Sequence, residues 1–401
     1  MAAKINKRSL SCFKLLPQNN EGRCKYMIYL DNAATTPVKR DVLDVIINTM
    51  QNCWGNPSSA YEFGLESKRI IEDARLTIAQ SINAELDEII FTSGASEANA
   101  LAISGFLHYY ENNDSEYPYF ITSNIEHSSI PLFNADAVID VDYDFGNIDI
   151  ELLERKLSDL WKDSKKLVSI QAANNEIGVI HDIRAISNIV HKYNGVFHTD
   201  ATQYYPYYKI DVKAMGIDMM SVSGHKFGCP KGIGFLYVKR GISLSPIIYG
   251  TQNNALRGGT ENVPYIAGLA KAIKLLDYSN ETSLKFKRDY CLQKIYDLDC
   301  MQSINLNGDA KNRLPNNINI HIKDVDAQML IALLDLNGIC VSAGSACHSY
   351  DAKPSRVLKA IGLSDKETKE SIRITLNEDT TYEEIDKFVE TLQMILTQIL
   401  S

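Results

Sequence analysis

The middle of the chain alternates short apolar runs with longer amphipathic stretches. Runs rich in β-branched and aromatic residues predict strands at residues 88–91, 119–122, 166–171, 195–199, 219–223 and 234–238. Helical patterns lie between them, such as residues 66–84, where one stripe consists of Ile70, Ile71, Ala74, Ile78 and Ile82. Strands that alternate with helices are typical of an α/β layer, so we expect a mostly parallel sheet.

The pattern changes near residues 277–282. Beyond this point, two helical stretches surround a short predicted strand pair, 316–322 and 371–376, and an amphipathic helix follows at 382–400. Thr381 and Glu384 have the spacing of a capping box at the start of that helix. We predict an N-terminal extension (1–27), a large domain (28–278) and a small α+β domain (279–401), with the ligand site in the cleft between the two domains.

Length and charge narrow the class of protein. The 401 residues suffice for one large core and a smaller one. Lys plus Arg is 41 and Asp plus Glu is 50, and this net charge of −9 argues against nucleic acid or an anionic membrane as the main partner. No run of about 18 apolar residues is present, so no transmembrane helix is expected.

The cysteines and the N-terminal segment bear on location. The eight cysteines include no C-x-x-C pair, which favours a reducing compartment, and we expect a cytoplasmic protein. The first 25 residues hold six basic side chains and one acidic one but no apolar core of a secretory signal. An ordinary extension is the simpler interpretation, and a presequence for a mitochondrial-type organelle is the alternative.

Polar residues follow several of the predicted strands. Lys226 lies between a strand and a glycine-rich turn, and Asp200 ends a strand 26 residues earlier. Carboxyl ends of strands are where α/β sheets bind ligands, and a carboxylate there can keep a pyridine nitrogen protonated. Taken alone, Lys226 is more simply a solvated loop residue, and Asp200 is equally well explained as a helix N-cap.

Three further segments allow two interpretations each. Gly94, before a predicted helix, lets the backbone approach an anion at the helix N-terminus, or it belongs to a plain N-cap. His127 follows a strand and can stack on a planar ring, or it is a structural histidine. Asn174 and Asn175 follow the run 166–171, where asparagines also form turns.

Together these segments, in this order and spacing, resemble fold-type I pyridoxal-phosphate (PLP) enzymes, and more narrowly the class V aminotransferase and cysteine desulfurase family. The resemblance runs from about residue 28 to the C-terminus and implies a seven-stranded type of sheet in the large domain. It is carried by the motifs YLDNAATTPV (29–38), GNPSS (55–59), FTSGASEAN (91–99), EHSS (126–129), NNEIG (174–178), HTDATQ (198–203), SGHK (223–226), PKGIGFLYV (230–238), RGGTENVP (257–264) and SAGSAC (342–347).

The resemblance implies a role for individual residues around PLP. Lys226 would bind the cofactor covalently, and Asp200 would pair with the pyridine nitrogen. His127 would stack on the ring, and Gln203 would hydrogen-bond its phenolic oxygen. The residues implied around the phosphate are Ala95, Ser96, Ser223 and His225.

The resemblance also implies a substrate site and a second subunit. Asn175 would contact the substrate carboxylate, and Arg373 would bind it with a bidentate pair. Thr260 would reach the phosphate of the neighbouring subunit, so a homodimer is expected. No metal ligand is implied.

Cys347 narrows the expected reaction. It lies in a Gly/Ser-rich stretch with turn-forming residues on both sides, which predicts a loop, and loops often carry function. The stretch resembles the cysteine loop of desulfurases, and the spacing of 26 positions from Cys347 to Arg373 resembles the long loop of the NifS/IscS-like group I. The resemblance implies that the Cys347 thiolate takes sulfur from L-cysteine as a persulfide and leaves L-alanine, with His127 as proton acceptor.

Some positions depart from the family pattern, and several interpretations stay open. The stretch before RGGT (257–260) lacks the Glu-Arg pair that the family often shows, and Asn377 and Glu378 stand where Gly-Arg is common. These changes bear on docking of a partner more than on PLP chemistry. Alternatives are a selenocysteine lyase, another class V aminotransferase-type enzyme, and a non-catalytic subunit that binds a sulfur-accepting partner. The acceptor could be an iron–sulfur scaffold, a tRNA-thiolation protein or a DNA-sulfur-modification system.

Overall fold

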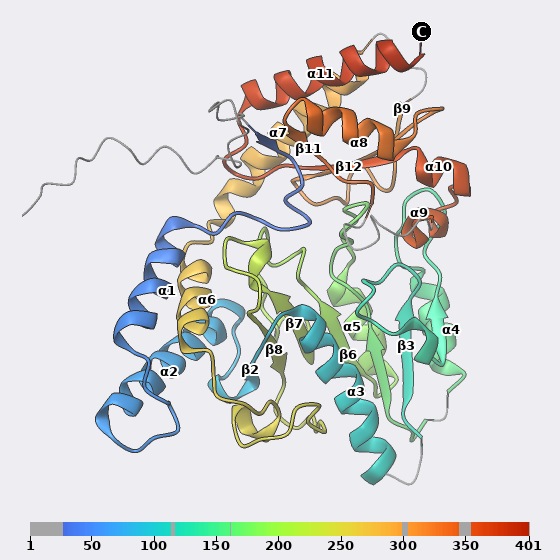
Figure 1. The fold of residues 1–401 in the computed structure, drawn as a ribbon. Helices are drawn as coiled ribbons and strands as arrows, with labels where there is room; N and C mark the ends of the chain where they lie inside the picture. Colours follow the sequence, from blue (N-terminus) through green and yellow to red (C-terminus); the bar gives the residue numbers. More distant parts are fainter. Residues whose placement is uncertain (1–26, 114–116, 161, 299–303, 345–353, 401) are drawn as a thin grey trace, which may run out of the picture.

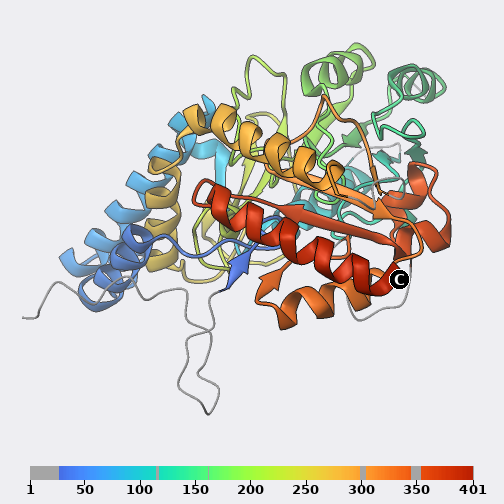
Figure 2. The same cartoon turned by 90° about the horizontal axis from the view of Figure 1, so that it is seen from above.

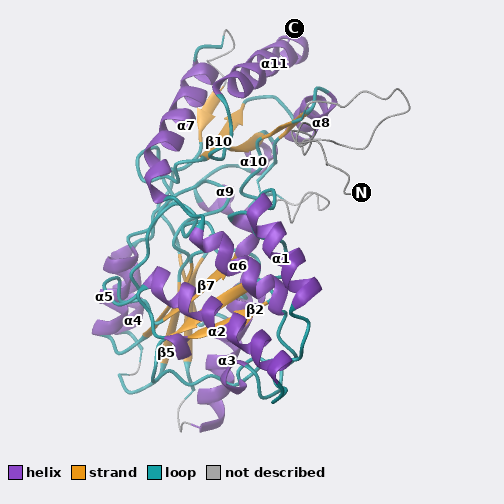
Figure 3. Cartoon of the chain, turned by 90° about the vertical axis from the view of Figure 1, so that its left-hand side faces the viewer, coloured by secondary structure: helices purple, strands orange, loops and turns teal. Residues whose placement is uncertain are grey.

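The computed structural model describes residues 27–113, 117–160, 162–298, 304–344 and 354–400. Cys347, the expected nucleophile, lies outside the described residues. Figure 3 shows a larger part built around one sheet and a smaller part beyond it that holds the C-terminus. Among the described helices, none is both long enough and apolar enough to cross a membrane.

The larger part is organised around a seven-stranded sheet with the order β2-β8-β7-β6-β5-β3-β4. β8 runs antiparallel to both of its neighbours, and the other neighbouring pairs are parallel. This confirms the expected α/β fold with a mostly parallel sheet. The strands are β2 (Ile89–Thr92), β3 (Tyr119–Ser123), β4 (Ala137–Ile139), β5 (Lys166–Ser169), β6 (Val196–Asp200), β7 (Met219–Ser223) and β8 (Gly234–Val238).

Both faces of this sheet are buried. Alternate side chains point to opposite faces of a strand, so along β8 Phe235 and Tyr237 join one core cluster while Leu236 and Val238 join another. The cluster that contains Leu236 and Val238 is covered by α3 (Ala95–Asn113). The cluster that contains Phe235 and Tyr237 is covered by helices shown around the sheet in Figure 1. These are α1 (Arg40–Asn52), α2 (Glu62–Ile82), α4 (Ile150–Ser158), α5 (Ile183–Lys192) and α6 (Val263–Lys274). Single-turn 3-10 helices are η1 (Leu86–Glu88), η2 (Leu132–Asn134), η3 (Gly224–Lys226), η4 (Asn253–Ala255) and η5 (Tyr278–Asn280).

The smaller part contains an antiparallel sheet with the order β12-β10-β9. Its strands are β9 (Ile304–Leu306), β10 (Asn317–Ile322) and β12 (Ser371–Thr375), and its helices are α7 (Glu281–Tyr296), α8 (Ala327–Leu336), α9 (Arg356–Ala360), α10 (Asp365–Lys369) and α11 (Tyr382–Leu400). Figure 2 shows α7 and α11 lying across this part. α11 has the predicted bounds, and reciprocal bonds between Thr381 and Glu384 form the predicted capping box.

The chain passes between the two parts more than once. β1 (Ile28–Tyr29) pairs in parallel with β11 (Ile339–Cys340), and Ile28 and Leu30 belong to the core cluster of the smaller part. In the reverse direction, Val357 and Leu358 of α9 pack in the core of the larger part. The domain boundary near residue 278 stays a prediction, and each predicted domain contributes residues to the core of the other part.

Candidate active site

Lys226 ends the short turn that follows β7. Its half-buried amine donates hydrogen bonds to the carbonyl oxygens of Ala33 (2.7 Å) and Ala34 (2.8 Å). Thr36 fixes this N-terminal segment against the same turn, because both its backbone N–H and its hydroxyl bond to the His225 carbonyl at 2.9 Å. The amine is therefore held at the carboxyl edge of the sheet between two segments far apart in sequence.

Gln203 reaches the same place from the next strand. Its amide donates to the Ala33 carbonyl at 3.0 Å, the oxygen that also accepts from Lys226. Gln203 lies three residues beyond the end of β6, which is parallel to β7. The structure thus brings together two predicted cofactor residues, Lys226 and Gln203, around one main-chain oxygen.

Asp200, the last residue of β6, is buried, with 7% of its surface exposed. One carboxylate oxygen accepts from the backbone N–H of Thr202 (3.0 Å) and the other from the side-chain amide of Asn99 on α3 (2.8 Å). A buried carboxylate on the strand next to the Lys226 turn suits a protonated pyridine nitrogen. Sequence reasoning did not single out Asn99, although it lies within the motif FTSGASEAN.

His127 lies half-buried in the turn after β3. Its Nδ1 lies 2.8 Å from the hydroxyl and 3.2 Å from the backbone nitrogen of Ser129, and the Asn99 amide also donates to that hydroxyl at 2.8 Å. The charge of His127 is among the causes that lower the pKa of His225, so the two imidazoles are near one another. Ser129, a second residue that sequence reasoning missed, joins His127 to Asp200 through Asn99.

The expected phosphate residues surround the start of α3. Ala95 and Ser96 form its first turn, where backbone N–H groups have no partner within the helix. Gly94 has φ +152°, and a Cβ there would lie 3.3 Å from the Ser223 hydroxyl. A glycine before a helix N-terminus, with a hydroxyl beside it, fits a bound phosphate.

His225 is neutral near pH 7. Burial is the largest cause that lowers its pKa, and together with the nearby Lys226, Lys231 and His127 it brings the pKa to about 4. Its Nδ1 lies 3.2 Å from the Thr35 hydroxyl. His225 can therefore hydrogen-bond a phosphate but adds no positive charge to it.

Arg373 lies on β12 and is 1% exposed. One terminal nitrogen donates to the Asn175 carbonyl and the other to the Asp31 carboxylate, both at 2.8 Å. Its Nε is buried and has no hydrogen-bond partner among the described residues. Because buried guanidinium donors are normally satisfied, this orphan N–H suits an incoming carboxylate. Asp31 is a further contact that sequence reasoning did not predict.

The described residues on either side of the Cys347 segment (345–353) lie at one carboxylate, that of Glu176. The Ser355 hydroxyl donates to Glu176 Oε2 at 2.6 Å, and a Cβ on Gly344 would lie 3.0 Å from the same oxygen. Arg356 binds the carbonyl of Glu126, the neighbour of His127. Glu176 in turn follows Asn175, so both ends lie beside loops that carry expected site residues.

The described cysteines with resolved pKa shifts are poor nucleophiles. Burial raises the pKa of the Cys229 and Cys291 thiols to about 12, and burial beside Glu66 raises that of Cys53. A thiol reacts as its thiolate, so these shifts oppose nucleophilic chemistry at those three residues. Cys229, although it lies near Lys226 in sequence, packs in the core of the larger part.

Thr260 is exposed in the loop before α6. Three residues earlier, Arg257 forms an ion pair with Glu97 in the first turn of α3 (2.8 Å), which fixes this loop near the expected phosphate site. The predicted contact between Thr260 and a neighbouring subunit stays a prediction.

Residues 28–388 match the family model described as Aminotransferase class-V. The chain belongs to the aminotransferase class-V family. Within this family it is 39% identical over 387 residues to "Cysteine desulfurase IscS" of Dictyoglomus turgidum, covering 94% of this chain and 96% of that protein. It is 37% identical to "Cysteine desulfurase IscS" of Methanosarcina thermophila, with 93% and 92% covered. The crystal structure of a NifS-like protein from Rickettsia africae has a TM-score of 0.83 and 35% identity, covering 92% of this chain and 99% of that one. Family membership confirms the resemblance predicted from the motifs.

Proposed function

We propose that this chain is a PLP-dependent cysteine desulfurase that converts L-cysteine to L-alanine and transfers the sulfur to Cys347. One observation carries the proposal. Adjacent parallel strands place a buried carboxylate, Asp200, and a lysine amine, Lys226, at the same edge of the sheet. The relatives named as cysteine desulfurases support the choice of reaction within the family.

The described residues fit PLP. Lys226 supplies the amine that would bind the aldehyde of PLP, and Asp200 supplies the anion for its pyridine nitrogen. Gln203 supplies an amide that shares the Ala33 carbonyl with the Lys226 amine. The phosphate would be bound by the first turn of α3, Ser223 and neutral His225. When bound, PLP would draw electrons from the substrate's α-carbon and so weaken the bonds next to it.

The substrate carboxylate would be bound at Arg373. The buried Nε offers one donor without a partner, while Asp31 and the Asn175 carbonyl hold the guanidinium in place. This anchor fixes the amino acid with its α-carbon oriented, which lowers the entropic cost of reaction. Lys226, once its amine is free, can hold a proton at Nζ.

Cys347 would accept the sulfur as a thiolate. Both described ends of its segment are attached beside the loops of His127 and Asn175, which supports delivery of this thiol to the site. Attack on the substrate sulfur would form an S–S bond and break the carbon–sulfur bond, leaving a persulfide on Cys347. The persulfide would pass to an acceptor protein, for iron–sulfur cluster assembly or thio-modification.

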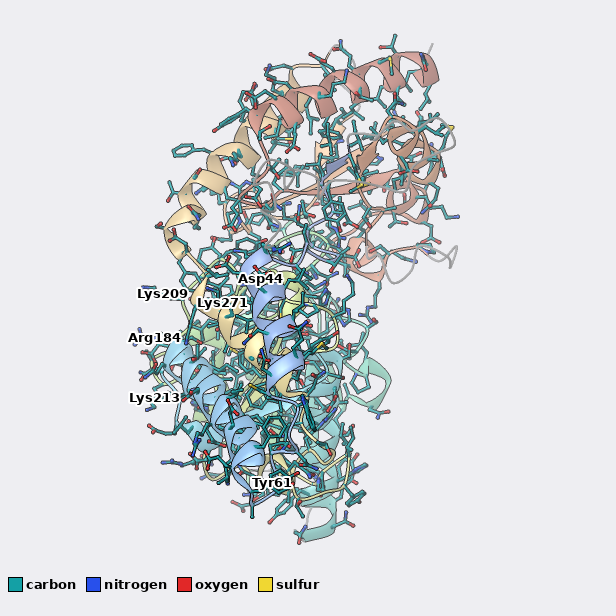
Figure 4. All side chains as sticks on the ribbon, turned by 60° about the vertical axis from the view of Figure 1, so that its left-hand side comes forward. Asp44, Tyr61, Arg184, Lys209, Lys213 and Lys271 are labelled. Atoms are coloured by element: carbon teal, nitrogen blue, oxygen red, sulfur yellow. The ribbon has the colours of Figure 1, made fainter. Side chains whose placement is uncertain are left out.

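A homodimer is part of the proposal. Along α1 and the turn to α2, large apolar side chains are exposed: Ile47, Met50, Trp54 (74% exposed) and Tyr61. Figure 4 views this side, with Asp44 on the upper part of α1 and Tyr61 at the bottom. Exposed apolar groups in one region favour a protein interface, and a second copy would also offer Thr260 to its neighbour.

A cytoplasmic location stays a prediction from the sequence.

The test is to incubate the purified protein with L-cysteine and measure its intact mass and the alanine released. We expect alanine and a mass gain of one sulfur atom that maps to Cys347. Cys347→Ser should abolish both, while Cys340→Ser, at a half-buried cysteine of β11, should retain them. Alanine production by Cys347→Ser at the rate of the unmodified protein would contradict the proposal.

A further inference from the structure

Three side-chain contacts connect Asp200 to His127. Asn99 Nδ2 lies 2.8 Å from Asp200 Oδ2 and 2.8 Å from the Ser129 hydroxyl, which in turn lies 2.8 Å from His127 Nδ1. Asn99 is fully buried, so water does not compete for these bonds. The connection joins α3, the end of β6 and the turn after β3, three segments far apart in sequence.

The orientation of the Asn99 amide follows from its neighbours. An ionised carboxylate only accepts hydrogen bonds, so Asn99 must present its NH₂ group to Asp200. The same NH₂ group has a second hydrogen for Ser129, and Asn99 Oδ1 is buried without a partner among the described residues. The reverse orientation would place the amide oxygen against the carboxylate. The Ser129 oxygen therefore accepts one bond from Asn99.

The donors around His127 Nδ1 then fix where the ring carries its proton. The backbone N–H of Ser129 can only donate, and it points at Nδ1 from 3.2 Å. This donor requires a lone pair at Nδ1, so a neutral ring carries its proton on Nε2. The Ser129 hydroxyl accepts from Asn99 and can then donate its own hydrogen to the same nitrogen.

We propose that Ser129 and Asn99 are positioning residues that hold His127 as the Nε2–H tautomer. Neutral His127 then offers a hydrogen-bond donor at Nε2, and it can take up a proton only at Nδ1, on the side of Ser129. This restricts the proton-acceptor role predicted for His127 from the sequence. The role of this tautomer in catalysis rests on the proposed function, whereas the assignment of the tautomer itself does not.

The tautomer can be measured without turnover. Protein labelled with ¹⁵N-histidine, with and without added PLP, is examined by multiple-bond ¹H–¹⁵N correlation, and His127→Gln identifies the His127 signals. We expect a protonated Nε2 and an unprotonated Nδ1 in the unmodified protein. Ser129→Ala and Asn99→Ala should move these signals toward a mixture of tautomers. Ser129→Thr, which keeps the hydroxyl, should restore them.

Ser128→Ala is the matched control, because Ser128 is the exposed neighbour of Ser129. It should leave the His127 signals unchanged. Alanine production should fall about tenfold in Ser129→Ala, the equivalent of about one hydrogen bond, and not in Ser128→Ala. A proton found on Nδ1, or signals that stay the same in both Ser129→Ala and Asn99→Ala, would overturn the proposal. Absence of alanine from every variant with an intact Nε2–H signal would instead contradict the proposed function.

Discussion

Lys226 and Gln203 donate hydrogen bonds to the same carbonyl oxygen, that of Ala33, at 2.7 and 3.0 Å. The residue that supplies this oxygen lies far earlier in the chain than either donor. The amine at the centre of the proposed chemistry is thus placed by its own turn and by an N-terminal segment. Changes in that segment should affect the site even where they alter no reactive side chain.

Replacement of Lys226 by alanine should abolish covalent PLP binding. The chain would lose the amine that lies between the segments around Ala33 and β7. Reduction with borohydride followed by mass measurement should attach PLP to the unmodified protein and not to Lys226→Ala. Lys231→Ala, in the same glycine-rich loop but exposed, should keep the attachment. Attachment of PLP at full yield in Lys226→Ala would show that another lysine binds the cofactor.

Asp200→Asn should keep the cofactor but slow the reaction. The substitution preserves shape and removes the anion expected beside the pyridine nitrogen, so electron withdrawal by the ring would weaken. We expect alanine production to fall by at least about 100-fold, or about 2.7 kcal/mol in the barrier, with PLP absorbance retained. Full activity in Asp200→Asn would show that the carboxylate has only a structural role. Thermal unfolding of the same variant excludes loss of folding as the cause.

Arg373→Lys should weaken substrate binding. Lysine keeps the charge but lacks the planar fork that binds a carboxylate with two parallel bonds. We expect the KM for L-cysteine to rise about tenfold or more, the equivalent of about 1.4 kcal/mol, in steady-state kinetics. Arg288→Lys, which replaces another buried arginine bound to the Leu314 carbonyl, controls for the loss of a buried guanidinium. An unchanged KM in Arg373→Lys would show that the substrate carboxylate binds at another residue.

Acid should destabilise the fold through His181. Burial lowers its pKa to about 4, and neither ring nitrogen has a hydrogen-bond partner among the described residues. The unfolded chain binds the proton near pH 6.5, so stability present above that pH is lost as the pH falls toward 4, by up to about 3 kcal/mol. Unfolding midpoints from pH 7 to 4.5 should fall less steeply in His181→Leu than in the unmodified protein. His108→Gln, at an exposed position, should follow the unmodified curve.

Periodicity predicted the long and central elements well. β7, β8 and α11 have the predicted bounds, because buried strands and amphipathic helices have strong local patterns. The predicted helix at 66–84 begins at Glu62 and ends at Ile82 instead, since helix ends carry weaker signals than helix interiors. The two-residue strands β1 and β11 carry too little pattern to be found, and their pairing joins residues about 300 positions apart.

The site was predictable where a side chain with distinctive chemistry lies at the end of a strand or just after it, as for Asp200 and Lys226. The carbonyl oxygens of Ala33 and Ala34 were not predictable, because every residue has such an oxygen and only the fold selects which ones face the amine. Asn99 was detectable in the sequence, because a polar residue on an otherwise apolar stripe of a helix indicates a buried hydrogen-bond partner. Asp31 left no signal of its contact, because its partner Arg373 lies 342 positions later in the chain and no local pattern relates the two.

The parallel pairing of β1 with β11 has a consequence for dissecting the molecule. A fragment that starts at residue 279 would lack Ile28 and Leu30, which are buried in the core that this fragment has to build. Its β11 edge would be bare and its apolar interior would be open to water, so we expect such a fragment to be poorly soluble. A linker that joins residues 27–31 to the fragment would be the rational way to produce the smaller half separately.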